Sequence, residues 1–297
     1  MNYLITGASG FIGHKLVDSL LSSGNTVNYL ARRRSRHLDS RASFHCWNPE
    51  EPPLLSSVPR LDVIIHLAGE PIAQRWSAEV KQSISESRVG TTRKLVAAIA
   101  KLKHKPSVLI CASAVGYYGD RGEEILTEAS GPGSGFLAEL CVEWECEALR
   151  AQESGLRVVP IRIATVLGRN GGALKKMLLP FRLGLGGRFG DGRQWVSWIH
   201  IDDLTSLLRF AAENPAVTNP LNGSSPEPVT NARFTAALGR SVHRPAVLPL
   251  PKSALKLILG EMADFLFTSL RVIPEAPMRA GFQFDHPELD AALRDIV

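Results

Sequence analysis

Short, nearly continuous apolar runs alternate with longer amphipathic stretches through the first half of the chain. The short runs have the length of buried strands, and the longer stretches have the apolar spacing of helices. The predicted strands are Tyr3–Thr6, Thr26–Ala31, Asp62–Leu67, Ser107–Ala112 and Arg157–Ile163. The predicted helices are Phe11–Ser22, Ser77–Lys101 and Gly135–Glu153. Because strands that alternate with helices form parallel βαβ units, we predict an α/β fold with a doubly wound parallel sheet.

The pattern changes after Leu167, where glycines and then prolines become frequent. We therefore predict a first domain over residues 1–166 and a smaller C-terminal α+β lobe over residues 167–297. The stretch Asp202–Glu213 has helical spacing, so residues 200–214 are expected to return to the first domain. Since ligands of open α/β sheets bind at the carboxyl ends of the strands, the cleft should lie between the two lobes.

Composition and charge exclude several classes of protein. The chain has 34 Lys and Arg against 29 Asp and Glu, and its one basic cluster, Arg32–Arg36, is not interleaved with aromatic residues, so we expect no nucleic-acid partner. The four cysteines form no CxxC pair, which argues against a metal site. No apolar run reaches the roughly 18 residues of a membrane span, so we expect no membrane partner. Because Asn2–Ile5 leads directly into a glycine loop and leaves no room for a signal peptide, we expect a cytoplasmic protein.

A glycine-rich turn, Thr6–Gly13, follows the first predicted strand and opens the first predicted helix. In this setting Gly7 permits a tight turn, Gly10 lets the backbone approach a pyrophosphate, and Gly13 lets the helix pack closely on the sheet. The free N–H groups at the helix N-terminus favour an anion. The sequence therefore predicts a Rossmann-type dinucleotide site that comprises Gly7, Gly10, Phe11, Ile12 and Gly13.

The end of the second predicted strand indicates which dinucleotide is bound. An NAD-binding protein usually has an Asp or Glu there for the ribose 2′-OH, whereas this chain has Ala31 and then four arginines around Ser35. Guanidinium groups bind phosphate in a bidentate manner. We predict NADP(H), with Arg32 as the main contact of the 2′-phosphate and Ala31, Arg33 and Ser35 beside it. The alternative is a solvated basic turn.

These features resemble the extended short-chain dehydrogenase/reductase superfamily, whose pattern TGxxGxxG matches residues 6–13. Other similar segments are His66–Gly69, Ser87–Thr91, Ser113–Gly119, Val166–Gly168 and Trp198–Asp203. The further cofactor-binding residues that the resemblance implies are Leu67, Ala68, Gly69, Arg88, Ala112 and Val166. Leu67 and Ala68 would contact the adenosine side of the cofactor, and Val166 would lie near the nicotinamide. Arg88 would either reach a cofactor phosphate or face solvent.

Three segments of the second half narrow this resemblance: Leu179–Gly187, Gln194–His200 and Ala280–Phe284. They are similar to a subgroup of nucleoside-diphosphate-sugar epimerase-like proteins, the SulA-like epimerase family. The similarity spans essentially the whole chain. It implies the fold and the cofactor, and it leaves the reaction open between oxidoreductase and epimerase.

The superfamily's chemistry uses a Tyr and a Lys one helical turn apart, where the Lys lowers the pKa of the Tyr. In this chain the corresponding segment contains neither residue. One register gives Leu137 and Cys141 at the two positions, and a shift by one residue gives Phe136 and Leu140. The usual acid/base pair is therefore missing.

This loss has three interpretations. Another group replaces the phenol, for which the candidates are Tyr117, Tyr118, Cys141, Glu143 and His200; or the protein binds its cofactor without chemistry; or the substrate needs no strong acid, as an activated alkene does not. The resemblance places Ser113 next to the nicotinamide and the substrate oxygen. Our catalytic candidates are accordingly Ser113 and Tyr117.

We therefore expect an NADP(H)-dependent oxidoreductase or epimerase that acts on a small polar substrate such as a nucleotide sugar. The alternative is a non-catalytic NADP(H)-binding redox sensor or scaffold. The aromatic residues of the glycine-rich stretch, with one arginine, form either the outer wall of the cleft or a core that joins the lobes: Phe181, Arg182, Phe189, Trp195 and Trp198. Asn222 and Gly223 are interpreted as part of a loop. Relatives are often dimers, so a homodimer is an option.

Overall fold

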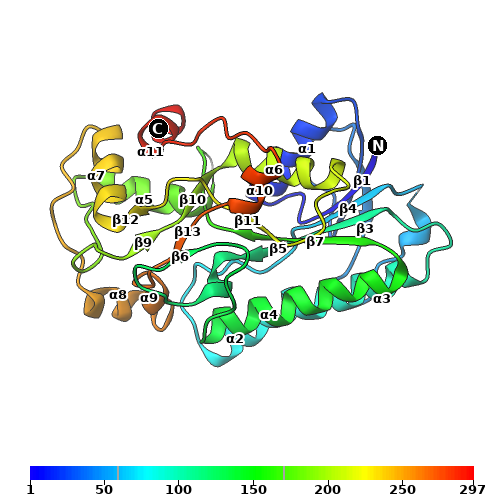
Figure 1. Ribbon diagram of the computed structural model, residues 1–297, viewed down its shortest axis with the longest axis horizontal. Coiled ribbons are helices and arrows are strands. Elements are labelled where there is room, and N and C mark those ends of the chain that lie inside the picture. The colour runs from blue at the N-terminus through cyan, green and yellow to red at the C-terminus, as the bar shows by residue number, and fades with distance from the viewer. Residues whose placement is uncertain (59, 170) are drawn as a thin grey trace.

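In the computed structural model, which describes residues 1–58, 60–169 and 171–297, seven strands form one central parallel sheet (Figure 1). Its strands are β1 (Asn2–Thr6), β2 (Thr26–Ala31), β3 (Ser43–Cys46), β4 (Val63–His66), β5 (Val108–Ala114), β7 (Arg157–Ile163) and β11 (Leu221–Gly223). Their order across the sheet is β11-β7-β5-β4-β1-β2-β3, and every neighbouring pair is parallel. The predicted fold class, a Rossmann-type doubly wound α/β sheet, is confirmed.

Helices cover both faces of this sheet. Successive strand residues point to opposite faces, so the apolar strands contribute to an apolar core on each face. On β1, Tyr3 and Ile5 belong to the apolar core beneath α1 (Phe11–Ser22) and α6 (Ile201–Glu213). Leu4 instead belongs to the core on the opposite face, between the sheet and the helices α3 (Thr91–Ala100) and α4 (Phe136–Leu149). Figure 1 shows α1 and α6 above the sheet and α3 and α4 below it. Each fully buried aliphatic side chain contributes roughly 1.5–3 kcal/mol to this packing.

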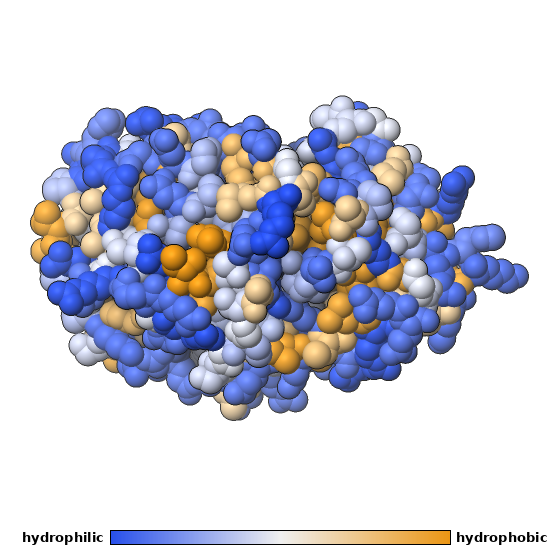
Figure 2. All heavy atoms as spheres, in the orientation of Figure 1, coloured by the Kyte–Doolittle hydropathy of each residue, from blue (hydrophilic) through white to orange (hydrophobic). Residues whose placement is uncertain are grey.

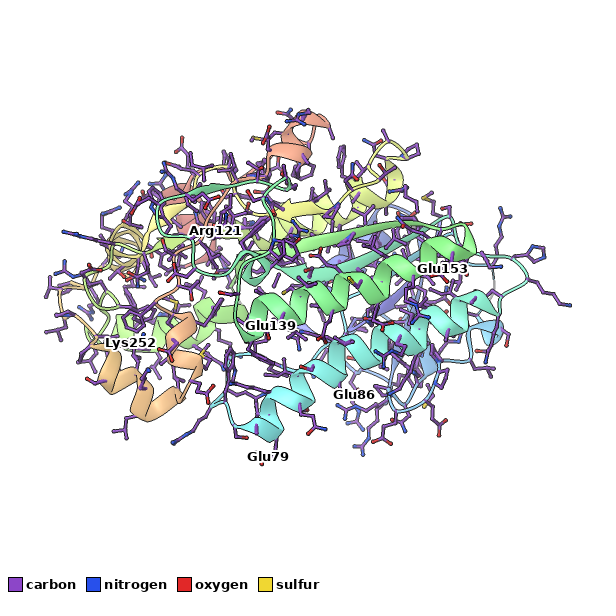
Figure 3. The ribbon with its side chains drawn as sticks, turned by 60° about the horizontal axis from the view of Figure 1, so that its bottom comes forward. Glu79, Glu86, Arg121, Glu139, Glu153 and Lys252 are labelled. Carbon is purple, nitrogen blue, oxygen red and sulfur yellow. The ribbon has the colours of Figure 1, made fainter. Side chains whose placement is uncertain are left out.

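The predicted helix Ser77–Lys101 is interrupted. It begins as α2 (Ala78–Ser85), capped by Ser77, passes through one π-helical segment, η2 (Glu86–Gly90), and continues as α3. In Figure 3 this run, marked by Glu79 and Glu86, lies alongside the helix that carries Glu139. At the start of α3, the Thr91 hydroxyl donates to the carbonyl of Ser87 in η2 at 2.6 Å. The wider π turn directs one side chain, Arg88, inward.

Two strands of the sheet were not predicted. β3 forms one edge, and β11 pairs with β7 at the other edge, with Asn222 opposite Arg162. The interpretation of Asn222 and Gly223 as a loop is therefore wrong. A strand of three residues is too short to show an alternating pattern. This strand comes from the segment assigned to the C-terminal lobe, yet it completes the main sheet.

The rest of the chain forms a smaller lobe, drawn on the left of Figure 1. Its helices are α5 (Gly172–Arg182), α7 (Asn231–Ser241), α8 (Lys252–Leu259), α9 (Met262–Phe265) and α11 (Leu289–Ile296), whereas α10 (Glu275–Arg279) packs beside β11 of the main sheet. Its two-stranded ladders pair β8 (Thr165–Leu167) with β10 (Trp198–His200), β9 (Trp195–Val196) with β12 (Val229–Thr230), and β6 (Ile125–Leu126) with β13 (Arg271–Val272). Phe181 and Trp198 are buried in the core between α5, α7 and α11, as the interpretation of a joining core predicts.

Among the described residues, none of the helices has the length and apolar character needed to cross a membrane. The face shown in Figure 2 is covered mainly by hydrophilic residues, with small apolar patches between them.

Candidate functional site

The strand order reverses between β1 and β4, and the site lies where these two strands end. From β1 the sheet grows toward β2 and β3 in one direction, and from β4 toward β5 and β7 in the other. Such a switch point leaves a crevice at the carboxyl ends of the strands. Gly7, which follows β1, and Leu67, which follows β4, both line the groove found there. The groove has an open polar end and a deeper apolar cavity of about 470 Å³.

The glycine loop has the geometry that a bound pyrophosphate needs. Gly7 has a φ of 72°, and a Cβ at that position would lie 2.7 Å from the Leu67 carbonyl carbon. Gly10 N–H donates to the Gly7 carbonyl at 3.0 Å and closes the turn. Helix α1 then begins at Phe11 without a side-chain cap and without an acidic residue in its first turn. Its N–H groups and partial positive charge therefore remain available to phosphate.

The arginines after β2 lie at the open end of the groove. Ala31, Arg32 and Arg33 line a surface pocket of about 640 Å³ together with Ser9 of the glycine loop. Both guanidinium groups are exposed, and neither is paired with a carboxylate of the described residues. The fourth predicted contact, Ser35, is not among the residues that line this pocket. Its backbone N–H donates to the Tyr29 hydroxyl at 3.3 Å.

A buried polar chain fixes the end of β4 beneath the groove. Thr6 Oγ1 and His66 Nδ1 are 2.6 Å apart, and His66 Nε2 lies 3.0 Å from Thr92 Oγ1. Thr6 Oγ1 also accepts the Ala68 N–H at 3.2 Å. Complete burial lowers the pKa of His66 to about 4, so the ring is neutral at pH 7. The predicted contacts Leu67, Ala68 and Gly69 are held against the groove by this chain.

Arg88, for which the sequence left open a solvent-facing position, is buried instead. It is 8% exposed and lines the apolar cavity. Its Nη2 donates to the Glu70 carbonyl at 2.9 Å and its Nη1 to the Ile84 carbonyl at 3.3 Å. Its guanidinium carbon lies 5.3 Å from the centre of the Trp144 ring. Arg88 is the one cationic side chain among the described residues that line the cavity.

Helix α4 presents apolar side chains at the positions of the missing acid/base pair. Leu137 and Cys141, the two positions of the first register, both line the cavity, whereas of the second register only Leu140 does among the described lining residues. Phe136 packs on Trp76 instead, with ring centres 5.3 Å apart. Burial, with the nearby Glu145 carboxylate, raises the pKa of Cys141 to about 11, so its thiol stays protonated.

The polar side chain at the end of β5 points away from the cavity. Ser113 is 3% exposed, and its hydroxyl donates to Glu145 Oε1 at 2.6 Å. Arg162 makes a bidentate pair with the same carboxylate, with Nε and Nη2 each 2.9 Å from an oxygen. Burial alone would lower the pKa of Arg162, but the pairing with Glu145 outweighs it and raises the pKa. Ser113 is therefore hydrogen-bonded to a buried ion pair and is not part of the cavity wall.

The two tyrosines after β5 complete this network. Tyr118 Oη accepts from Arg162 Nη1 at 3.0 Å and donates to Asn222 Oδ1 at 2.7 Å, and burial raises its pKa to about 12. The guanidinium carbon of Arg162 lies 3.5 Å from the centre of the Tyr117 ring. Tyr117 is not among the residues that line the cavity, and neither is Ala112, which is buried in the core beneath α3 and α4. We define this set, Ser113, Tyr117, Tyr118, Glu145, Arg162 and Asn222, as the buried polar network.

The remaining acid/base candidates lie elsewhere. Glu143 is exposed on α4. His200 caps α6 with its Nδ1, which accepts the Asp202 N–H at 3.2 Å, and its Nε2 lies 3.4 Å from Asp295 Oδ2. His200, Asp202 and His286 are close enough to hold a metal. Because Nδ1 of His200 accepts a hydrogen bond, its Nε2 carries the proton and is not free to ligate a metal ion.

The far wall of the cavity comes from residues that the sequence did not single out. Met262, Phe265, Leu266 and Leu270 close it from the C-terminal third. Of the glycine-rich stretch, Phe189 and Trp195 line the cavity as the interpretation of an outer wall predicts, whereas Arg182 is exposed and is not among the lining residues. Phe11, Ile12 and Val166, three predicted cofactor contacts, form the near wall beside the glycine loop.

Comparison with known families and proteins gives concordant results. Residues 3–222 match the NAD dependent epimerase/dehydratase family, and residues 250–296 match a domain of unknown function (DUF1731). The "Epimerase family protein MT2273" of Mycobacterium tuberculosis is 44% identical over 295 residues, which cover 97% of this chain and 95% of that protein.

Solved structures agree with this family match. The crystal structure of the human epimerase family protein SDR39U1 with NADPH superposes with a TM-score of 0.91 at 35% identity and covers 100% of this chain and 99% of that one. UDP-glucuronic acid 4-epimerase from Bacillus cereus, solved with UDP-glucuronic acid and NAD, shares the fold, with a TM-score of 0.80 at 19% identity over 100% of this chain and 98% of that one.

Proposed function

The chain belongs to the NAD dependent epimerase/dehydratase family, and from this premise we propose that it is an NADP(H)-dependent oxidoreductase of the extended short-chain dehydrogenase/reductase type. The proposal of a reductase rather than an epimerase rests on one observation: α4 has apolar side chains where a Tyr and a Lys would be. A 4-epimerase must remove and return a proton on the sugar hydroxyl, and Leu137, Leu140 and Cys141 provide no group with a suitable pKa.

NADP(H) is the cofactor that the groove fits. Arg32 and Arg33 would hold the 2′-phosphate, the N-terminus of α1 the pyrophosphate, and Leu67 and Ala68 the adenosine side. The human relative was crystallised with NADPH, which supports this assignment. When bound, the cofactor supplies or accepts a hydride.

The chain's own residues then bind and orient the substrate and exclude water. Phe11 and Val166 pack beside the reactive end of the groove, and Phe265 and Leu266 shield it from the other side. Because the described residues of the wall include no proton donor of suitable pKa, hydride transfer leaves an anionic product, which takes up its proton from solvent after release. Acceptors whose reduced form is a stabilised anion, such as enones and quinones, are the ones this arrangement suits.

The same absence of acid/base groups favours one alternative, a protein that binds NADP(H) without chemistry. A reductase and a non-catalytic binding protein are distinguished by measuring NADPH consumption with enones, quinones and aldehydes. In parallel, the products are analysed after incubation with nucleotide sugars. We expect acceptor-dependent NADPH oxidation. Epimerised sugar would contradict the reductase assignment, and tight NADPH binding without turnover of any acceptor would favour the binding protein.

A further inference from the structure

We propose that the substrate of this cavity is an uncharged, largely apolar small molecule and that nucleotide sugars are excluded from it. This inference rests on the proposed function, because it concerns the same cavity. It also replaces our sequence-based expectation of a small polar substrate. The side chains of the cavity and the hydrogen bonds they already make carry the argument.

Apolar side chains close the cavity from three sides. Leu137 and Leu140 come from α4, Met177 from α5, and Phe265, Leu266 and Leu270 from the C-terminal third. Glu139 on α4 and Lys252 on the neighbouring α8 are exposed on the outside (Figure 3). An interior of this kind gains free energy by removing apolar surface of a ligand from water.

Several polar groups of the wall are already satisfied by the protein. The Ser197 hydroxyl donates to the Leu270 carbonyl at 2.6 Å and accepts the Val272 N–H at 2.9 Å. The Trp195 indole N–H donates to Glu123 at 2.6 Å, and the Thr268 hydroxyl donates to the Asp264 carbonyl at 3.4 Å. A sugar ring would bring several hydroxyls into this space and find few free partners for them, which costs free energy for each unpaired group.

The charge of the wall also argues against a nucleotide diphosphate. Among the described lining residues there is no carboxylate, and Arg88 is the one cation. Its guanidinium is held by the Glu70 and Ile84 carbonyls and packs on Trp144. A buried diphosphate requires several cations or helix N-termini. Arg32 and Arg33 line a separate pocket, and the N-terminus of α1, which lies at this cavity, is assigned to the pyrophosphate of the cofactor.

The volume limits the ligand further. The cavity of about 470 Å³ includes the space beside Gly7 and Gly10, where the pyrophosphate would lie, and the space beside Val166, where the nicotinamide would lie. A pocket of this size is near the lower end for small-molecule sites. After the cofactor is bound, the remaining enclosed space is of a size that suits one or two rings.

Calorimetric titration of the NADP⁺-saturated protein tests this directly, with 1-tetralone as an uncharged bicyclic probe and UDP-glucose as the sugar nucleotide. We expect 1-tetralone to bind at least about tenfold more tightly than UDP-glucose, with a negative heat-capacity change. Leu266→Asp places a carboxylate in the wall and should weaken 1-tetralone binding by about tenfold or more. Leu257→Asp makes the same change at a residue of α8 that is 78% exposed and should leave the affinity unchanged.

Phe265→Ala provides a second variant that introduces no charge, and circular dichroism and NADP⁺ affinity show that each variant is folded. UDP-glucose binding more tightly than 1-tetralone would overturn the inference, as would equal 1-tetralone affinities of Leu266→Asp and Leu257→Asp. Because these experiments measure binding and not turnover, the inference can fail or stand independently of the proposed reductase activity. 1-Tetralone binding as expected, with no reduction of any acceptor, would leave the inference standing and refute the reductase.

Discussion

The two ends of the groove use polar residues in opposite ways. At the adenosine end, Arg32, Arg33 and the N-terminus of α1 are uncovered and free to meet an anion. At the cavity end, Ser113, Glu145 and Arg162 are turned inward and satisfy one another behind an apolar wall. Free polar groups bind ligands, whereas mutually satisfied ones hold the fold. Substitution of the free polar residues at the first end should therefore change ligand affinity, and substitution of the mutually bonded polar residues at the second end should change stability.

The largest effect is expected at the buried polar network. Glu145→Ala leaves the Arg162 guanidinium buried without its counter-charge and should lower the free energy of unfolding by about 3–5 kcal/mol. Glu143→Ala, on the exposed side of the same helix, should change it by less than about 0.5 kcal/mol. Urea denaturation measures both. A comparable loss in the two variants would show that the network does not act as described.

A pH dependence is expected from His66, beneath the adenosine end. Burial lowers its pKa from 6.5 to about 4, so as the pH falls below 6.5 the unfolded chain takes up a proton that the folded chain does not. The stability that neutral His66 provides is complete above pH 6.5 and is lost progressively toward pH 4, by roughly 3 kcal/mol. His66→Gln should flatten this part of the stability–pH curve, and the exposed control His104→Gln should not. Parallel curves for His66→Gln and the unaltered protein would contradict a neutral buried His66.

At the adenosine end, Arg32→Ala should weaken NADPH binding by about tenfold to a hundredfold, because a charge-assisted contact with the 2′-phosphate is lost. NADH, which lacks that phosphate, should be affected little. Arg34→Ala is the matched control, since Arg34 belongs to the same basic run but is not among the residues that line the pocket. Titrations that show equal losses for NADPH and NADH would refute the 2′-phosphate assignment.

The smallest effect should come from Ser113→Ala. The variant removes one hydrogen bond to Glu145, a carboxylate that keeps its two contacts with Arg162, so the free energy of unfolding should fall by about 1 kcal/mol. Turnover with an accepted substrate should stay within about twofold. A large drop in turnover with unchanged NADPH affinity would instead restore Ser113 as a catalytic residue and would break the contrast between the two ends.

The glycine loop could be predicted because its chemistry is local. Residues 6–13 contain the strand end, the turn and the helix start, and the φ of Gly7 and the uncapped start of α1 agree with that prediction. The arginine run after β2 was predictable for the same reason. Such motifs carry their geometry within a few consecutive residues.

The cavity could not be predicted because its walls come from distant parts of the chain. Arg88 is buried within a π-helical segment, which no apolar periodicity reveals. Leu266 and Leu270 reach the cavity through contacts of the C-terminal third, for which the sequence has no motif. The inward orientation of Ser113 depends on Glu145 and Arg162, which lie on other elements of the fold.

The reductase assignment is tested most directly by following a label from the cofactor to the product. NADPH that carries deuterium at the transferable C4 position is incubated with the protein and a panel of apolar enones, and the products are analysed by mass spectrometry and NMR. We predict one deuterium on carbon in the reduced enone, and about tenfold or greater loss of this product when Arg32→Ala is assayed at limiting NADPH. Enones that remain unreduced and unlabelled, in the presence of protein that binds NADPH, would contradict the account.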